Sequence, residues 1–419
     1  MSNETGHAWG FGLLLSVLAV AGCSDEDRPP PSRGSASSNS PVAGCEAISH
    51  QSCDVRAADC QARLLALAAC LREDEEPPMP PVTVMSEPAF GDYLYELLEE
   101  EPQPEVNHLE RALVSLGMVQ RGAYDADVVV SDLVKTIGGV YRPETDDILV
   151  VDHGSAVDRD TMSSIVLHEF VHYLQDLQVD LAAFSEEFSV STDAALAAVS
   201  VIEGEAQFHQ LRYYASLSGL NPNAVDYRES FDSMVSFSED YLLEQPSPYA
   251  QVRVVFPYAW GGRYMQATWV DGGRDAVAER FASPPTQTRS LMVASAPADV
   301  AARSFESPSA PAGLRLYAED VGGAFTLFLY ATTLTDVASA RELALEWRGD
   351  RMSIFATDDD AGTVVVWRIA LASDAAAAEF AAAAGRVVAS NEIRREGAEV
   401  VIAIADPVAD VEWALSSLE

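Results

Sequence analysis

Three residues in one short segment have the types and the spacing needed to bind a metal ion and activate water on it. They are His168, Glu169 and His172, in the pattern His-Glu-Phe-Val-His. On an α-helix, residues four positions apart lie on the same face, so the two histidines can hold one metal ion between them. Glu169 projects beside the first histidine, within reach of a metal-bound water. The pattern therefore predicts two metal ligands and a general base for hydrolysis.

The segment that carries this pattern has the periodicity of a buried helix. Apolar residues recur in it at helical spacing, at Met162, Ile165, Val166, Phe170, Val171, Leu174 and Leu177. Asp160 or Thr161 is expected to cap its N-terminus. We therefore expect the His-Glu-His face to be buried on most sides. The alternative is two ordinary histidines, because a five-residue motif also arises by chance.

A second predicted helix offers a third ligand, as a catalytic zinc ion needs. Residues 192–218 have an apolar stripe with a gap at Glu203, which places this carboxylate on the inward face. A buried carboxylate is costly unless it is paired or bound to a metal. Glu205 lies on a different side of the helix and is expected to point elsewhere.

The first motif followed by Glu203-Gly-Glu-Ala206 resembles the gluzincin zinc metallopeptidases. In many of them the Glu of a downstream Glu-Gly-x-Ala segment is the third zinc ligand. The resemblance covers residues 135–210 and implies a zincin-like domain that acts on a peptide or protein substrate. It implies Glu169 as the catalytic base. It also implies one zinc ion per chain with three ligands, His168, His172 and Glu203.

A looser likeness, to a group of uncharacterised bacterial proteins, extends beyond the metal-binding segments. Three stretches carry it: Gly139-Val-Tyr-Arg-Pro-Glu-Thr145, the Gly-Gly and Pro-Pro pairs within residues 272–289, and Trp347-Arg-Gly-Asp-Arg351. None of them indicates a particular substrate.

The composition limits the class of partner. The chain has 419 residues, of which 65 are acidic and 26 basic, and its formal net charge is −39. Nucleic acid is disfavoured as a partner, because phosphate binding needs clustered Lys and Arg. The acidity fits a well-solvated surface.

The N-terminus predicts an exported lipoprotein. Residues 1–22 have the apolar run of a signal peptide, and Leu18-Ala-Val-Ala-Gly-Cys23 resembles a bacterial lipobox, in which Cys23 is lipidated. The first ten residues lack the Lys or Arg that such a signal usually carries. Residues 23–43 are expected to form a flexible tether. Resemblance to bacterial lipoproteins places the protein at the outer membrane, facing the periplasm or the exterior, because Ser24 follows the cysteine.

A cysteine cluster follows the tether. An even number of cysteines in an exported chain predicts disulfides, here two with three possible pairings, among Cys45, Cys53, Cys60 and Cys70. Residues 44–72 are expected to form a stapled helical hairpin. A zinc ribbon is the weaker alternative, because no Cys-x-x-Cys pair is present. Residues 73–81 form an acidic, proline-rich linker.

Residues 82–350 are predicted to form the metallopeptidase domain, which is mainly helical. Within it we expect helices at 86–101 and 105–117, a short β-rich run at 128–130, and a loop-rich stretch at 221–250.

Two further features of this domain bear on function. Residues 138–152 read as a hairpin just ahead of the metal-binding helix, with an edge that an extended peptide can pair with. Tyr258 precedes a helix through Trp269 that breaks at Asp271-Gly-Gly-Arg274. Tyr258 is the candidate donor to an oxyanion. The alternative is that Tyr258 only packs within the fold and that its hydroxyl has a hydrogen-bond partner there.

The last part of the chain, residues 351–419, is predicted to be a small α+β unit. Strands are expected at 352–356, 363–371, 387–393 and 400–404, and helices at 374–384 and 408–418. The whole protein is therefore predicted to be α+β, with a small sheet or hairpin inside a mainly helical catalytic domain.

Two functions of different classes fit these patterns. One is a membrane-anchored zinc peptidase. The other is a non-catalytic surface lipoprotein with a structural or metal-capturing zinc site. Glu169 favours the peptidase, because a structural site needs no base beside its ligand.

The lipid anchor can be tested directly. In Cys23→Ala the acceptor of the lipid is missing, so the protein should move from the membrane fraction to the soluble fraction. Fractionation of cells that express the parent or the variant measures this. Unchanged membrane association of the variant would reject the anchor.

Overall fold

The computed structural model describes residues 45, 48–100, 107–293, 298–386, 392–407 and 411–415. The predicted signal peptide, the predicted lipidation site Cys23 and the predicted tether at 23–43 lie outside the described residues. Within the described part, no helix is both long and apolar enough to cross a membrane.

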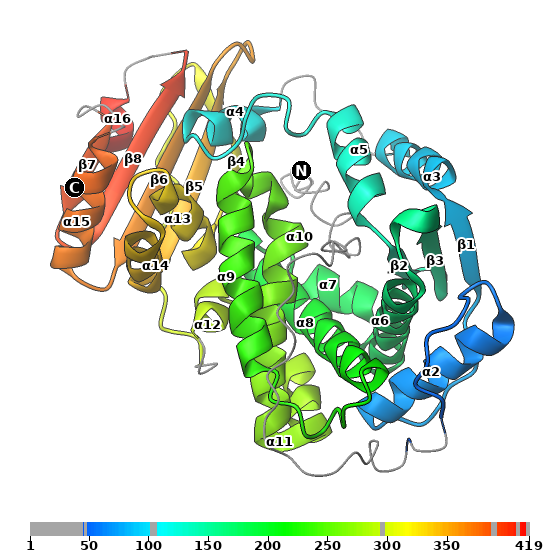
Figure 1. Ribbon diagram of the computed structural model, residues 1–419. Helices are drawn as coiled ribbons and strands as arrows, with labels where there is room; N and C mark the ends of the chain where they lie inside the picture. Colours follow the sequence, from blue (N-terminus) through cyan, green and yellow to red (C-terminus); the bar gives the residue numbers. More distant parts are fainter. Residues whose placement is uncertain are drawn as a thin grey trace.

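The fold is α+β, as predicted. Central helices lie between a three-stranded and a five-stranded sheet (Figure 1). The helices are α2 (Ala58–Arg72), α3 (Glu87–Glu100), α4 (His108–Ser115), α5 (Ala126–Thr136), α6 (Arg159–Val179), α7 (Leu181–Phe188), α8 (Thr192–Leu217), α9 (Arg228–Glu244), α10 (Val252–Phe256), α11 (Gly262–Ala282), α12 (Thr288–Met292), α13 (Gly323–Thr332), α14 (Val337–Leu345), α15 (Asp374–Ala384) and α16 (Glu412–Leu415). The strands are β1 (Val82–Ser86), β2 (Gly139–Arg142), β3 (Asp147–Asp152), β4 (Leu314–Asp320), β5 (Trp347–Thr357), β6 (Thr363–Leu371), β7 (Ile393–Glu396) and β8 (Glu399–Asp406).

Two disulfides staple the N-terminal segment, which confirms the predicted number and decides the pairing. Cys45 bonds to Cys70, and Cys53 bonds to Cys60. The described residues of this segment contain one helix, α2, preceded by a non-helical stretch, so the predicted helical hairpin is wrong. The non-helical stretch is tied down by the two bridges, so it needs no second helix to hold it in place. Helix α2 packs its leucines against α6 and α8. Disulfides of this kind indicate an extracellular or periplasmic location.

The small sheet contains the predicted hairpin. Its strand order is β1-β3-β2, with β1 parallel and β2 antiparallel to β3. Strand β2 is therefore an edge strand, and it lies against α6. The β-rich run predicted at 128–130 is wrong, because those residues are in α5. Val130 and Leu133, three positions apart, bury one face of that helix in a cluster with Phe90 and Leu94, and this packing overrides the strand preference of valine.

Two more expectations in the helical region need correction. The stretch predicted as loop-rich contains α9, which buries Phe231, Val235 and Leu242 at helical spacing. The cap of α6 is Asp158, whose side chain accepts a hydrogen bond from the amide of Thr161 at 2.7 Å. The predicted break near residue 272 is confirmed, because Gly272 and Gly273 leave the helical conformation within α11.

The five-stranded sheet is antiparallel, in the order β4-β5-β6-β8-β7. The division predicted between residues 350 and 351 falls inside β5, and the sheet already begins at β4. The strand expected at 387–393 is observed only from Ile393, as β7, and residues 387–391 lie outside the described part. Of the predicted final helix, only α16 is described. The remaining strands and α15 match their predicted positions.

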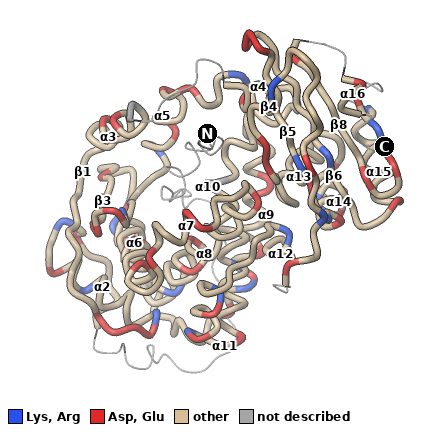
Figure 2. The backbone as a smooth tube through the Cα atoms, turned by 180° about the vertical axis from the view of Figure 1, so that it is seen from behind, with Lys and Arg blue, Asp and Glu red and all other residues tan. Residues whose placement is uncertain are grey.

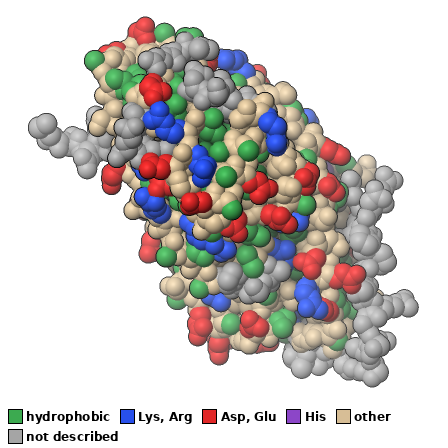
Figure 3. All heavy atoms as spheres, turned by 90° about the vertical axis from the view of Figure 1, so that its left-hand side faces the viewer, with side chains coloured by type: hydrophobic (Ala, Val, Ile, Leu, Met, Phe, Trp, Pro, Cys, Tyr) green, Lys and Arg blue, Asp and Glu red, His purple; other side chains and the backbone are tan. Residues whose placement is uncertain are grey.

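Charged residues are spread over the whole molecule. Acidic positions occur along both the helical region and the C-terminal sheet (Figure 2). On the face that Figure 3 shows, basic side chains lie among acidic ones. On the C-terminal sheet, Arg368 pairs with Glu399 at 2.8 Å and Arg394 pairs with Glu412 at 2.6 Å. These basic groups are therefore already paired within the fold.

A buried carboxylate ties the sheet to the helices. Asp350, 2% exposed, accepts four hydrogen bonds, from the amides of Gly322 and Gly323 and from the indoles of Trp347 and Trp367, at 2.9 to 3.0 Å. These donors use the acceptor positions of the carboxylate fully. This explains the Trp-Arg-Gly-Asp stretch as a structural element.

The same loop caps the helix that carries Glu203. The amide of Thr192 donates to Asp320 at 2.8 Å, and the amide of Asp193 donates to the carbonyl of Val321 at 3.0 Å. The first amides of a helix have no partner inside it. The C-terminal sheet therefore fixes the start of α8.

We predict that Asp350→Ala lowers the free energy of unfolding by about 3 kcal/mol, because it leaves several buried donors unpaired. Urea denaturation of the purified protein measures this. The control is Asp358→Ala, an exposed position, which should change stability by less than about 0.5 kcal/mol. Equal stability of the two variants would contradict the role of Asp350.

Candidate metal centre

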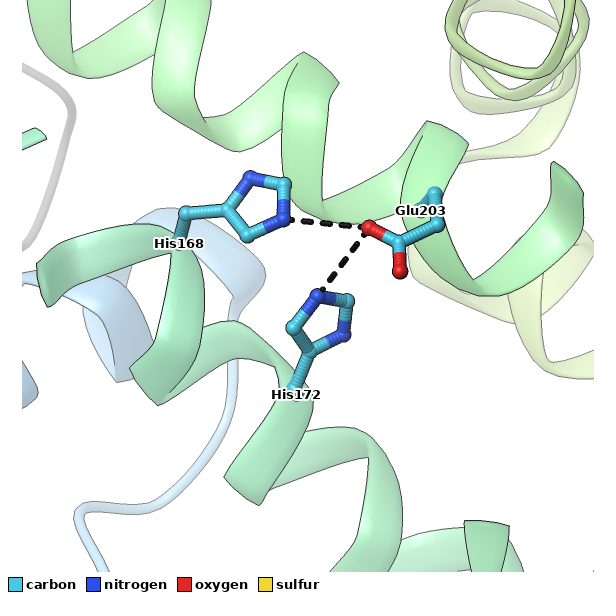
Figure 4. A group of neighbouring side chains, drawn as sticks. All are labelled: His168, His172 and Glu203. Carbon is cyan, nitrogen blue, oxygen red and sulfur yellow. Dashed lines mark hydrogen bonds and ion pairs between the residues drawn. The ribbon is translucent and has the colours of Figure 1, made fainter. Parts of the chain in front are cut away.

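Helices α6 and α8 bring the three predicted ligands together. The Nε2 atoms of His168 and His172 each lie 3.2 Å from Oε2 of Glu203 (Figure 4). All three side chains are buried, and one ligand atom from each lies within 4.8 Å of the others. Two imidazole nitrogens and a carboxylate oxygen that face one point can hold a metal ion.

The backbone around Glu203 is packed very closely. A Cβ atom on Gly204 would lie 2.3 Å from the carbonyl carbon of Gly261, so only glycine fits there. Gly261 ends a π-helical turn, Pro257–Gly261, between α10 and α11. This contact sets the position of α8 against the turn that carries Tyr258, and it gives a physical reason for the glycine after Glu203.

Glu203 and His172 stabilise each other's charge. Burial by itself would raise the pKa of Glu203, but His172 and His168 outweigh it, and the pKa of Glu203 is lowered. Burial would lower the pKa of His172, but Glu203 outweighs it and raises that pKa. Burial, with the nearby His172, keeps the pKa of His168 below its usual value. Glu203 is therefore an anion, as a metal ligand must be.

Glu169 lies in the same buried site and is held by strand β2. Its Oε2 accepts a hydrogen bond from the amide of Tyr141 at 2.8 Å. A Cβ atom on Gly139 would lie 2.9 Å from Oε1 of Glu169, so the glycine lets the strand approach this carboxylate. Burial, and then the charge of Glu203, raise the pKa of Glu169 to about 7, although His172 and the amide oppose them. A base of this pKa suits proton transfer near neutral pH.

Tyr258 lies beside the ligands. Its ring stacks on that of His168, with centroids 5.9 Å apart. Its hydroxyl is buried and makes no hydrogen bond within the described residues. Burial, with the nearby Glu203 and Glu169, raises the pKa of Tyr258 well above its usual value, so the hydroxyl keeps its proton. After burial, Glu203 is the group that acts most strongly on this hydroxyl, so Tyr258 belongs to the same buried cluster as the candidate ligands.

Sequence reasoning missed one group at the site. Gln175 Oε1 lies 2.9 Å from Nδ1 of His172. Its position, three residues after His172, puts it on the same face of α6, and this spacing was a usable signal. Glu205 points away from the ligands, as predicted, but it is 1% exposed and pairs with Arg72 at 2.8 Å.

Comparison with known protein families gives a match in the C-terminal part of the chain. The domain of unknown function DUF8575 matches residues 314–414, about a quarter of the chain. The matched region contains the five-stranded sheet and none of the candidate site residues. No curated protein and no solved structure matches the chain.

We predict that the parent protein binds one zinc ion per chain and that Glu203→Ala weakens binding by at least tenfold, because it removes a ligand. Metal analysis and chelator competition measure this. The matched control is Glu187→Ala, an exposed glutamate on α7, which should bind zinc like the parent. Parent-like affinity of Glu203→Ala would remove that residue from the ligand set.

Proposed function

We propose that this protein is a zinc-dependent peptidase in which Glu169 is the general base. The observation that carries the proposal is the place of Glu169: a buried carboxylate, next to two histidines and Glu203, and held by the Tyr141 amide. A site that only binds a metal for structure has no use for a second carboxylate that is not a ligand.

Each residue of the site has a distinct task in this proposal. His168, His172 and Glu203 would hold the zinc ion, and zinc supplies a bound water with a pKa of about 7 and polarises a carbonyl. Glu169 takes the proton of the attacking water and gives it to the leaving amine. The Tyr141 amide keeps one oxygen of Glu169 engaged at 2.8 Å, so the other oxygen is free to face the water. Tyr258 donates a hydrogen bond to the oxyanion, because its hydroxyl is protonated and without another partner in the described part.

The proposed setting is outside the cytoplasm. The Cys45–Cys70 and Cys53–Cys60 disulfides support export to an oxidising compartment. An anchor at Cys23 and an outer-membrane location extend this proposal. A tethered peptidase of this kind would act on peptides or proteins near the membrane surface.

A non-catalytic zinc site is the second candidate. The burial of the ligands favours it, since His168 is 0%, Glu203 4% and His172 7% exposed. A structural site is closed in this way, whereas a catalytic site keeps a position for water and substrate. The two candidate functions differ in the role of Glu169: only the peptidase needs this residue, as the base for hydrolysis.

We predict that Glu169→Gln keeps zinc and the parent's melting temperature but lowers kcat by about 10² to 10⁴-fold, because the base acts on water and not on the metal. Turnover of a mixed peptide library by zinc-loaded parent and variant measures this. The control variant is Glu187→Gln, at an exposed position on α7.

Equal turnover by the parent and Glu169→Gln would reject Glu169 as the base. A zinc-loaded parent that hydrolyses no peptide in the library would favour the structural or metal-capturing site. Hydrolysis that a chelator abolishes and added zinc restores would support the peptidase.

A further inference from the structure

The amide of Gln175 links a metal ligand to a buried ion pair. Its Nε2 donates to the carbonyl of Ile202 and to Oε2 of Glu205, both at 2.9 Å, and its Oε1 faces Nδ1 of His172 at 2.9 Å. A carbonyl and a carboxylate can only accept hydrogen bonds, so the amide nitrogen must face them. Its oxygen must then face His172. Nδ1 of His172 therefore carries a proton, which leaves Nε2 as the atom that faces Glu203 and the metal position.

Glu205 holds this amide in place, because its Oε2 accepts the hydrogen bond from Nε2 of Gln175. Glu205 is itself buried, with 1% of its surface exposed. Arg72 holds this carboxylate in turn: its Nε donates to Oε1 of Glu205 at 2.8 Å and its Nη2 donates to Oε2 at 3.3 Å. Without Arg72, the carboxylate of Glu205 would lose both of these hydrogen bonds, and Gln175 would lose a firmly held acceptor.

Arg72 comes from the disulfide-stapled segment. It is the last residue of α2, two positions after Cys70, and it is 3% exposed. It also donates to the carbonyl of Leu174 at 3.3 Å and to Gln178 at 2.9 Å, both on α6. One side chain therefore connects α2 with both helices that carry ligands. Figures 1 and 2 both place α2 next to α6.

We propose that the disulfide-stapled segment, residues 45–72, positions a ligand of the metal centre without contacting the metal position itself. Arg72 fixes Glu205, Glu205 fixes Gln175, and Gln175 presents His172 in the tautomer that binds metal. Arg72, Glu205 and Gln175 are positioning residues, because none of them contacts the metal position. This inference rests on the proposed zinc site, and it does not depend on peptide hydrolysis.

The consequence is a link between disulfide formation and metal binding. The Cys45–Cys70 bond holds the end of α2, so it holds Arg72 against Glu205. The protein would bind zinc tightly only after this bond has formed, which happens in an oxidising compartment. Zinc is then retained where the protein is exported and is bound weakly before export.

The test is the zinc affinity of the full-length exported protein, measured by competition with a chromophoric chelator. Gln175→Met and Arg72→Met should each weaken zinc binding by about 10- to 100-fold, as loss of outer support does elsewhere. Arg56→Met is the matched control, because Arg56 belongs to the same segment but pairs at the surface with Asp152, and it should bind zinc within threefold of the parent.

A double variant separates positioning from general destabilisation. If Arg72 acts through Gln175, the Arg72→Met/Gln175→Met protein loses no more zinc affinity than the weaker-binding single variant. Additive losses would overturn the proposed route. Parent-like affinity in folded Gln175→Met would overturn it as well, and this uncharged substitution covers the case in which Arg72→Met does not fold.

The disulfide is tested in the same assay. Cys45→Ser/Cys70→Ser should lose at least tenfold in zinc affinity, whereas Cys53→Ser/Cys60→Ser, which leaves the end of α2 bonded, should lose less than threefold. Equal affinities of the two variants would overturn the role of the Cys45–Cys70 bond. A parent that binds no zinc would overturn this proposal and the proposed function together. A parent that binds zinc but hydrolyses no peptide would reject only the peptidase.

Discussion

The contact between one carboxylate and two imidazoles connects helices α6 and α8 at the centre of this molecule. Glu203 on α8 lies 3.2 Å from both His168 and His172 on α6, and all three are buried. Buried charges are stable only when their partners are held in place. The rest of the structure can be understood as the set of contacts that keeps α6 and α8 at this one separation.

Those contacts come from three sides. Strand β2 approaches α6 closely enough for its backbone to bind Glu169. The π-helical turn at Pro257–Gly261 touches α8 backbone to backbone at Gly204. The C-terminal sheet caps the start of α8, through Asp320 and the loop that Asp350 holds. The region that matches DUF8575 therefore supports the site mechanically without contributing a candidate ligand.

The stapled segment is the fourth support, and its contribution is electrostatic. Arg72 places a positive charge against Glu205, two residues along α8 from Glu203. The pKa of Glu205 stays low, although burial acts against ionisation, because Arg72 and then His209 favour the anion. Two carboxylates on one buried helix thus remain charged for different reasons, one beside histidines and one beside an arginine.

Local patterns in the sequence were enough for several elements. The spacing of His168 and His172, the gap in the apolar stripe at Glu203, the hairpin before α6 and the number of disulfides all follow from short-range periodicity and composition. The sequence did not predict helix α9 or helix α5, which contains Val128. Whether these segments form helices, strands or loops depends on packing partners far away in the chain.

Only the tertiary structure decided the disulfide pairing, the burial of Glu205, and the contacts of Glu169 with Tyr141 and of Gln175 with His172. The sequence by itself determined which residues could be ligands and base, because a helix fixes the relation of neighbours three or four positions apart. The sequence could not determine which groups from other elements face these candidate ligands and this base. That depends on how separate elements cross, and such crossings are set by the summed packing of residues that are distant in the sequence.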